Sequence, residues 1–472
     1  MGETRTEQDG MGEVAVPSDA YYGAETQRAV SNFPISPWRF GRRFIWALGL
    51  VKWSAAQANR ELGLLDDELA EAIALAADEV AAGKHDDQFV VDVFQTGSGT
   101  STNMNANEVI ANRANELLGA ALGSKKPVHP KDHVNRCQSS NDVIPTATHL
   151  AALSALVEAL LPSVDHLEDA LSAKAREFDR IVKTGRTHLM DATPVRLGQE
   201  FAGYASQMGH GRARVRSVLP HLGELALGGT AVGTGLNAHP DFARRAIAHL
   251  ADRTGLDLVE APNHFESQGA RDAIVEASGA VRTVAVSASR IANDLRWLAS
   301  GPSAAIGEIR LPALQPGSSI MPGKVNPVVA EAVIQVAAQV MGNDVAIGLA
   351  GLGSIFELNT MMPLMAYDIL FSIEALAAAI ELLASRCVEG VEANVERCRD
   401  LLSGNLATVT ALVPAIGYDA AAAVARQAAE TGKGIKQVLL DQGLMTEEQI
   451  DEALNLEAMT HPGLQQTGGA GT

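Results

Sequence analysis

Four polar segments interrupt a sequence that otherwise favours helices, and their residue types suit the binding of small anions. They begin at Gly97, His129, Thr184 and Pro316 and read GSGTSTNMNANE, HPKDHVNRCQSSND, TGRTHLMDATP and PGSSIMPGKVNP. Each segment borders a predicted helix, where hydroxyl groups and free backbone N–H groups bind carboxylates or phosphates at the positive end of the helix dipole. Helix capping alone would explain any single segment, whereas four in one chain indicate anion binding.

The segment at His129 also contains a histidine pair within a basic cluster. His129 and His133 have the spacing of a helical metal-binding pair, but Pro130 lies between them and no HExxH pattern is present, which argues against a metal. A basic cluster in an acidic protein suits a small dianion, although a solvated surface would have the same composition. The basic residues here are Lys125, Lys126, Lys131 and Arg136.

Two glycine-rich patterns fail the tests for nucleotide binding. A P-loop requires GxxxxGK followed by Ser or Thr, but five residues separate Gly317 from Gly323, and Val325 follows Lys324. The glycines between residues 228 and 235 do not form GxGxxG and lack a βαβ context. The sequence therefore predicts no nucleotide and no redox cofactor.

The elements that must position these segments are predicted to be helices. Aromatic residues make up only 4% of the chain, while alanine and leucine dominate, so the fold class is predicted to be all-α. Apolar residues recur every three or four positions after Val328, after Asn141, and near 271–299 and 364–385. These lengths predict a bundle, and helices this apolar indicate a homo-oligomer. From about Val395 we expect a small helical domain that ends in a disordered TGGAGT tail.

Composition limits the partners and the compartment. The chain has 472 residues and a formal charge of -19, which disfavours nucleic acid as a partner. Its three cysteines are too far apart for a redox pair or a zinc site and suit a reducing compartment. The acidic N-terminus does not read as a secretory peptide, and the most hydrophobic stretches are interrupted by polar residues. We therefore expect a cytoplasmic protein with no membrane partner.

The loop GSSIMPGKVNP, from Gly317 to Pro327, matches at every position the loop that marks the fumarase/aspartase superfamily. GSGTS with NMNANE, SSNDVIPTA and GRTHLMDATPV are similar to the remaining substrate-binding segments of that family, in the same order. Gly323 resembles the fumarase loop, since aspartases usually have Ala there. His188 within HLMDATPV also resembles fumarase, since aspartases typically have QLQDAVPM. The chain therefore most resembles the class II fumarases.

The resemblance implies a fold and an assembly. It implies a three-domain all-α fold with an N-terminal domain over 1–137, a central long-helix bundle over 138–395 that forms the core of a homotetramer, and a small C-terminal domain over 396–472. Each active site would collect segments from three chains. The implied reaction is the reversible, stereospecific hydration of fumarate to (S)-malate in the tricarboxylic acid cycle, by a hydro-lyase that needs no metal and no cofactor.

The resemblance also implies roles for individual residues. Ser318 would remove the carbon-bound proton, His188 would act as the acid for the departing hydroxyl, and Glu331 would orient the histidine. Which of Ser318 and His188 acts first on the carbon-bound proton stays open. Lys324 and the loop N–H groups would stabilise the enediolate-like carboxylate. Substrate would be bound by Ser98, Gly99, Thr100, Ser139, Ser140, Asn141, Thr187, Ser319, Lys324, Val325 and Asn326.

A second anion site would correspond to His129, Pro130, Lys131 and Asp132. This match is imperfect, because the family often has Asn at Lys131 and Arg at Lys126, and a lysine lacks the bidentate geometry of arginine. Two other functions stay open: an aspartate ammonia-lyase, and a catalytically silent member of the superfamily retained as a scaffold.

Overall fold

The computed structural model describes residues 3–463, and its helices divide between two compact units. Unit 1 contains 1–162, 211–286 and 335–378, and unit 2 contains 163–210, 287–334 and 379–472. Five long helices, each predicted from the 3.6-residue periodicity, contribute residues to both units. They are α6 (Leu161–Glu177), α7 (Leu197–Gly223), α10 (Asp272–Leu298), α11 (Val328–Gly351) and α12 (Met362–Leu383). The all-α fold class is confirmed.

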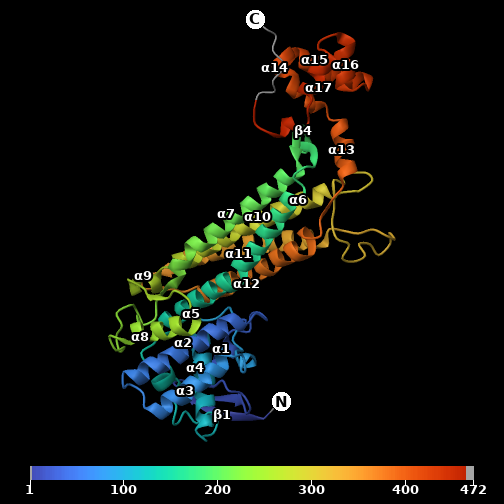
Figure 1. Cartoon of the computed structure of the whole chain (residues 1–472). Coiled ribbons are helices and arrows are strands. Elements are labelled where there is room, and N and C mark those ends of the chain that lie inside the picture. Colours follow the sequence, from blue (N-terminus) through green and yellow to red (C-terminus); the bar gives the residue numbers. More distant parts are fainter. Residues whose placement is uncertain (1–2, 464–472) are drawn as a thin grey trace. The chain divides into compact units, whose positions relative to one another are not determined.

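In unit 1, α2, α3 and α4 pack against one another, and α2 also contacts α5 and α8 (Figure 1). A short hairpin, β1 with β2, precedes them. The elements of unit 1 are β1 (Thr4–Asp9), β2 (Gly12–Pro17), α1 (Ala24–Asn32), α2 (Arg42–Glu61), α3 (Asp67–Ala81), η1 (Asp86–Gln88), α4 (Thr100–Leu117), η2 (Pro130–Val134), α5 (Ser140–Ala155), η3 (Leu156–Leu160), β5 (Glu224–Leu225), α8 (Phe242–Thr254), β6 (Val259–Glu260), α9 (His264–Gly269), β8 (Ser354–Ile355) and β9 (Leu358–Asn359).

Unit 2 combines a β-hairpin with a group of short C-terminal helices. The hairpin pairs β3 with β4 in antiparallel register, from Val182 opposite Arg196 to Thr187 opposite Met190. The C-terminal helices have their own apolar core around Val424, Val438 and Ile450. The elements of unit 2 are β3 (Val182–Thr187), β4 (Met190–Arg196), β7 (Ile309–Arg310), η4 (Ala384–Val388), β10 (Glu392–Ala393), α13 (Val395–Ser403), η5 (Leu406–Leu412), α14 (Val413–Ile416), α15 (Tyr418–Thr431), α16 (Ile435–Gln442), α17 (Glu447–Ala453) and η6 (Ala458–Thr460).

The long helices contact one another through polar side chains inside each unit. In unit 1, Ser278 of α10 donates to Asp344 of α11 at 2.7 Å, and Asn343 donates to Ser372 of α12 at 3.1 Å. In unit 2, Tyr204 of α7 donates to Asp294 of α10 at 3.1 Å. These contacts confirm that the predicted helices form a bundle.

The segment at Thr184 corrects one sequence expectation. It borders a helix, α7, but its own residues form the β3–β4 hairpin rather than a helix start. Strand pairing explains this, because the segment folds back on itself from Val182 opposite Arg196 to Thr187 opposite Met190, and its tip from Thr187 to Asp191 is exposed. The expectation of a disordered TGGAGT tail falls on residues outside the described range.

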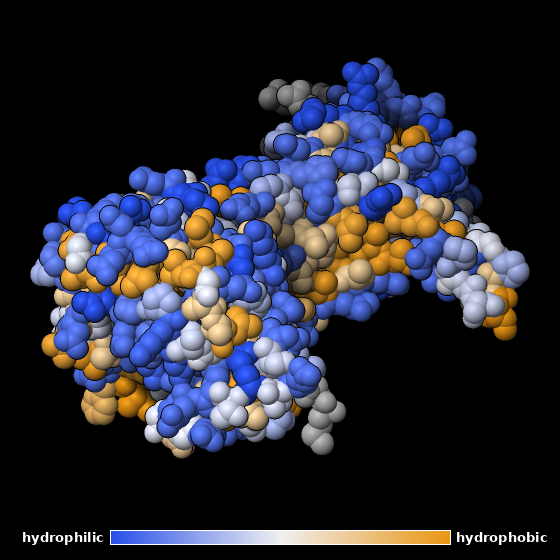
Figure 2. All heavy atoms as spheres, turned by 90° about the horizontal axis from the view of Figure 1, so that it is seen from below, coloured by the Kyte–Doolittle hydropathy of each residue, from blue (hydrophilic) through white to orange (hydrophobic). Residues whose placement is uncertain are grey.

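Apolar side chains remain exposed on the helices, as the orange areas of Figure 2 show. On α11, Ala330, Val333, Ala337 and Val340 are buried. Val345 and Leu349 of the same helix are 62% and 60% exposed. By length and composition alone, two helical stretches could cross a membrane: Ser140–Glu177 and Val328–Gly351. Of the most apolar 18-residue window in each, 83% and 28% are buried, respectively. The first is a core helix, and the second presents an apolar face that nothing within residues 3–463 covers.

Candidate active site

The first two predicted substrate-binding tracts meet in unit 1, where the N-termini of α4 and α5 lie together. Gly99 precedes α4 with φ 72°, and a Cβ built there would lie 2.8 Å from the Ile144 side chain of α5. Only glycine fits this position, because it tolerates both the left-handed backbone and the close approach. The hydroxyls of Ser98 and Thr100 are 2.8 Å apart. Asn103 of α4 donates to the Ser140 hydroxyl at 3.2 Å, which joins the two tracts.

The start of α5 is fixed by a buried capping box. Ser139 accepts from the Asn141 N–H at 3.2 Å, and Asp142 accepts from the Ser139 N–H at 2.8 Å. Asp142 also accepts from the N–H groups of Gly228 and Thr230, and burial raises its pKa to about 6. Two helix N-termini with hydroxyl side chains therefore face one region, which suits a carboxylate.

Lys52 of α2 lies beneath this region and was not singled out from the sequence. It is fully buried and donates to Asn135 at 3.0 Å and to Gln138 at 2.9 Å. Burial lowers the pKa of Lys52 to about 7. The signal available in the sequence was a single lysine inside the apolar run LGLVKWSAA. A lysine buried without a carboxylate in contact is energetically costly, which is typical of functional regions.

Thr187 and His188 lie at the tip of the hairpin in unit 2, as exposed residues. His188 and Leu189 form its two-residue turn with φ values of 58° and 61°. This is the geometry of a type I′ turn, which usually carries Asn and Gly. Non-glycine residues in this region are strained, and such strain clusters at functional sites.

A buried group of charges, which we call the hairpin ion cluster, holds the base of this hairpin. It consists of Lys183, Arg186, Glu200 and Glu308. Arg186 contacts both oxygens of Glu308 at 2.9 Å, and Lys183 lies 3.1 Å from Glu308 and 2.8 Å from Glu200. Glu308 is fully buried, and β7, which begins at the next residue, leads into the loop that contains Ser318. The sequence interpretation missed this cluster, because its charges are far apart along the chain.

The loop from Gly317 to Pro327 is closed at its base by its own backbone. The Gly317 N–H donates to the Lys324 carbonyl at 2.7 Å, and the Asn326 amide donates to the Gly317 carbonyl at 2.7 Å. A Cβ at Gly317 would lie 2.7 Å from the Lys324 carbonyl oxygen, so a side chain there would break the closure. The Asn326 side chain therefore closes the loop.

Ser318 occupies a polar position inside this loop. Its hydroxyl oxygen accepts hydrogen bonds from the N–H groups of Ile320 and Met321, at 3.1 and 2.8 Å. Ser319, Lys324 and Val325 are exposed. Two N–H donors directed at one hydroxyl oxygen stabilise negative charge on it.

Several predicted residues stay apart in one chain. Lys324 and Glu331 are exposed, and neither has an ion-pair partner among residues 3–463. Within unit 2, no hydrogen bond or ion pair joins His188 to Ser318 or Glu331 in that range. The predicted catalytic residues of unit 2 thus lie on separate elements: a hairpin, a loop and the first turn of α11.

The predicted second anion site is a cavity of about 580 Å³ in unit 1. His129 and Asp132 line it together with Lys125, Lys126 and His133. The other two predicted residues do not line it, since Pro130 is buried and Lys131 pairs with Glu25 at 2.6 Å. Within residues 3–463, no group of three or more His, Cys, Asp or Glu side chains could hold a metal ion.

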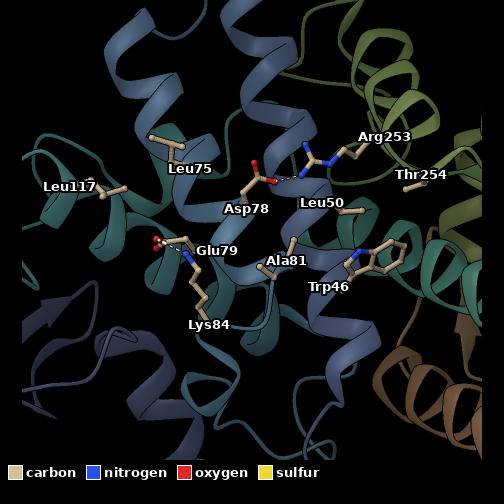
Figure 3. A pocket seen from close by; sticks show the side chains of 11 residues that line it. Trp46, Leu50, Leu75, Asp78, Glu79, Ala81, Lys84, Leu117, Arg253 and Thr254 are labelled. Atoms are coloured by element: carbon tan, nitrogen blue, oxygen red, sulfur yellow. Dashed lines mark hydrogen bonds and ion pairs between the residues drawn. The ribbon is translucent and has the colours of Figure 1, made fainter.

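Another cavity, of about 530 Å³, lies among α2, α3 and α8 (Figure 3). Its charged side chains are already paired, Asp78 with Arg253 at 2.9 Å and Glu79 with Lys84 at 3.4 Å. Trp46, Leu50 and Leu75 supply apolar walls. It contains none of the predicted site residues, so we do not assign it to the reaction.

Comparisons with known proteins identify the family of the chain. A family model described as lyase matches residues 12–342, and one described as fumarase C C-terminus matches 409–461. The chain is 57% identical to a class II fumarate hydratase of Halobacterium salinarum, over 98% of both chains. It is 56% identical to the class II fumarate hydratase of Mycobacterium tuberculosis, over 96% of both.

Solved structures give the same result. A class II fumarase from Schistosoma mansoni matches with a TM-score of 0.94 and 38% identity, over 97% of this chain and 99% of that one. A fumarate lyase:delta crystallin from Brucella melitensis matches with a TM-score of 0.92 and 46% identity, over 98% and 100%. The chain therefore belongs to the lyase family that contains the class II fumarate hydratases.

Proposed function

We propose that this protein is a class II fumarate hydratase that interconverts fumarate and malate. The observation that carries the proposal is the Ser318 hydroxyl, which accepts two backbone N–H groups at 3.1 and 2.8 Å inside a closed loop. Removing a proton next to a carboxylate requires a base, and an unassisted serine is too weak. Donors directed at its oxygen stabilise the alkoxide, which raises the population of the basic form.

The remaining roles follow from position and charge. Lys324, exposed and unpaired within the described range, supplies positive charge to the enediolate-like carboxylate that develops. The N-termini of α4 and α5, with Thr100, Ser140 and Asn141, hold a substrate carboxylate. His188, on its exposed turn, acts as the acid for the departing hydroxyl, and Glu331 orients it.

Membership of this family implies a dicarboxylate substrate and an oligomeric assembly. We extend this to a homotetramer in which the tract at Thr100, the hairpin tip at His188 and the loop at Ser318 come from different chains. The exposed apolar face of α11 supports such an assembly. The three domains over 1–137, 138–395 and 396–472, the cytoplasmic location, the absence of membrane and nucleic-acid partners, and a weak second anion site at His129 and Asp132 belong to the same proposal.

The test follows the absorbance of the fumarate double bond. Malate and then aspartate are supplied separately to the purified oligomer, and product is expected only from malate. Product from aspartate alone would replace the hydratase with an ammonia-lyase, and no turnover of either would favour a silent scaffold. Ser318→Ala should lower kcat by about 100-fold or more, the usual contribution of a positioned base. Ser303→Ala, at an exposed serine outside this loop, is the control and should retain most activity.

A further inference from the structure

A second polar cavity of unit 1, of about 360 Å³, lies at the N-terminus of α10. Its lining includes His149, His221, Glu224, Glu266, Arg271 and Asp272. None of these residues belongs to the candidate active site or to the second anion site. The proposed hydratase reaction therefore leaves this cavity without a role.

Arg271, immediately before α10, is the cation on the cavity wall. Its side chain is 3% exposed, and its Nη1 donates to the Ser267 carbonyl. Its Nη2 is buried without a hydrogen-bond partner, and no carboxylate oxygen within residues 3–463 lies within 4.0 Å of the guanidinium. Burial lowers the pKa of Arg271 only to about 10, so the group stays charged at neutral pH. A buried charge with no carboxylate in contact is costly, and Glu266 and Asp272 act on Arg271 only at longer range, which indicates that an anionic group belongs against the guanidinium.

His149 of α5 supplies a hydrogen-bond acceptor beside this cation. It is 5% exposed, and its Nδ1 lies 2.9 Å from the Glu224 carbonyl oxygen. A carbonyl only accepts, so Nδ1 carries the proton. Burial, with the charge of Arg271, lowers the pKa of His149 to about 3, so the ring is neutral and Nε2 accepts. Nε2 is also buried without a partner.

The rest of the lining is acidic. The side chains of Glu224, Glu266 and Asp272 have no hydrogen bond or ion pair within the described part of the chain, whereas Glu276 pairs with His221 at 2.5 Å. Burial and the charges of Asp272 and Glu224 raise the pKa of Glu266. Three crowded carboxylates repel one another and would attract a cation.

This combination of charges selects one class of ligand. A simple anion would pair with Arg271 but would be repelled by the carboxylates of Glu224, Glu266 and Asp272. A simple cation would leave Arg271 unpaired. We propose that the cavity binds a zwitterion of the size of a small free α-amino acid. Its carboxylate contacts Arg271, and its ammonium group contacts Glu266 and Asp272 and donates to the Nε2 of His149.

The binding test uses calorimetry on the full-length oligomer with three kinds of probe. Glycine and L-alanine carry both charges, acetate carries only the anion, and methylammonium carries only the cation. None of these is a dicarboxylate, so none resembles the proposed substrate. Saturable binding of glycine or alanine, at least about 10-fold tighter than either single-charge probe, is expected. No binding of the zwitterions, or equal binding of all probes, would overturn the proposal.

Two variants test whether the zwitterion binds in this cavity. Arg271→Met should weaken zwitterion binding by at least about 10-fold, since a charge-assisted hydrogen bond is lost, and should not lower the thermal midpoint, since an unpaired buried charge is removed. Glu266→Gln changes an exposed side chain and should weaken binding without affecting folding. Arg244→Met, at an exposed arginine of α8, is the control and should bind normally.

Malate turnover should be unchanged in all three variants. Normal zwitterion binding by both Arg271→Met and Glu266→Gln would refute the site. So would a lower thermal midpoint in both variants without any ligand binding, because that result would mean that Glu266 itself pairs with Arg271 in solution.

Discussion

Replacing Glu308 by Gln tests whether the hairpin ion cluster positions the hairpin that carries His188. Glu308 is fully buried, contacts Arg186 twice at 2.9 Å, and lies 3.1 Å from Lys183. Glutamine has nearly the same shape but no charge. The substitution would leave Arg186 and Lys183 to share the single carboxylate of Glu200, which contacts only Lys183.

The expected effect is large for one substitution. Breaking a buried ion pair by neutralising one partner costs roughly 3–5 kcal/mol, because the other charge stays buried. Arg186 directly precedes Thr187 and His188, so a shift of the hairpin base moves the proposed acid. A displacement of about 1 Å at a reacting group can lower the rate about 100-fold.

The assay combines thermal unfolding of the oligomer with malate kinetics per folded protein. Glu308→Gln should lower both the thermal midpoint and kcat. Glu200→Gln, at a partly exposed residue, should have a smaller effect, and Glu430→Gln, at an exposed residue without a partner in the described chain, should have almost none. A Glu308→Gln enzyme with a lower thermal midpoint but normal kcat would show that the cluster stabilises the fold without positioning His188. An unchanged midpoint would refute the energetic reasoning itself.

Three further predictions concern the turn, the helix start and the buried lysine. Leu189→Gly should raise the thermal midpoint, because removing a non-glycine residue from the left-handed region is worth about 1–2 kcal/mol. The variant should retain activity, because the His188 side chain is unchanged. A lower thermal midpoint would argue against backbone strain at Leu189. Gly99→Ala should raise KM and lower stability through its clash with Ile144, and Ile144→Val should partly restore both; a normal KM would place the first tract outside the site. Burial lowers the pKa of Lys52 in the folded protein to about 7, so its contribution to stability is present above its unfolded pKa and is lost as the pH falls through 7. The thermal midpoint of the wild type should therefore fall between pH 9.5 and 7 relative to that of Lys52→Met. Parallel plots of thermal midpoint against pH for the two proteins would contradict the lowered pKa of Lys52.

The sequence predicted the helices well because their apolar positions recur at the helical period. The stretches after Val328 and near 271–299 and 364–385 became α11, α10 and α12 with ends within a few residues. The helical periodicity did not predict the β3–β4 hairpin. Its polar residues resemble those of a helix start, and only pairing between strands distinguishes the two.

The sequence also determined the types of the predicted site residues, because the polar side chains of the loop at Ser318 and of the tract at Thr100 follow one another closely along the chain. Tertiary structure decided which groups support them. The Asn326 side chain closes its loop, Lys131 pairs with Glu25 instead of lining the anion cavity, and the buried Lys52 donates to Asn135. Each outcome depends on which distant residues come into contact, and local periodicity contains no information about that.

The same limit applies to the charged groups that carry the new predictions. The sequence by itself determined an all-α chain of this lyase family and the letters of its polar tracts. Only the folded chain brought Glu308 to Arg186, 122 positions earlier, and placed Arg271 beside His149 in one cavity. Electrostatic interactions depend on distance and burial in three dimensions, so charges that are unremarkable in the sequence become decisive once folding removes them from water.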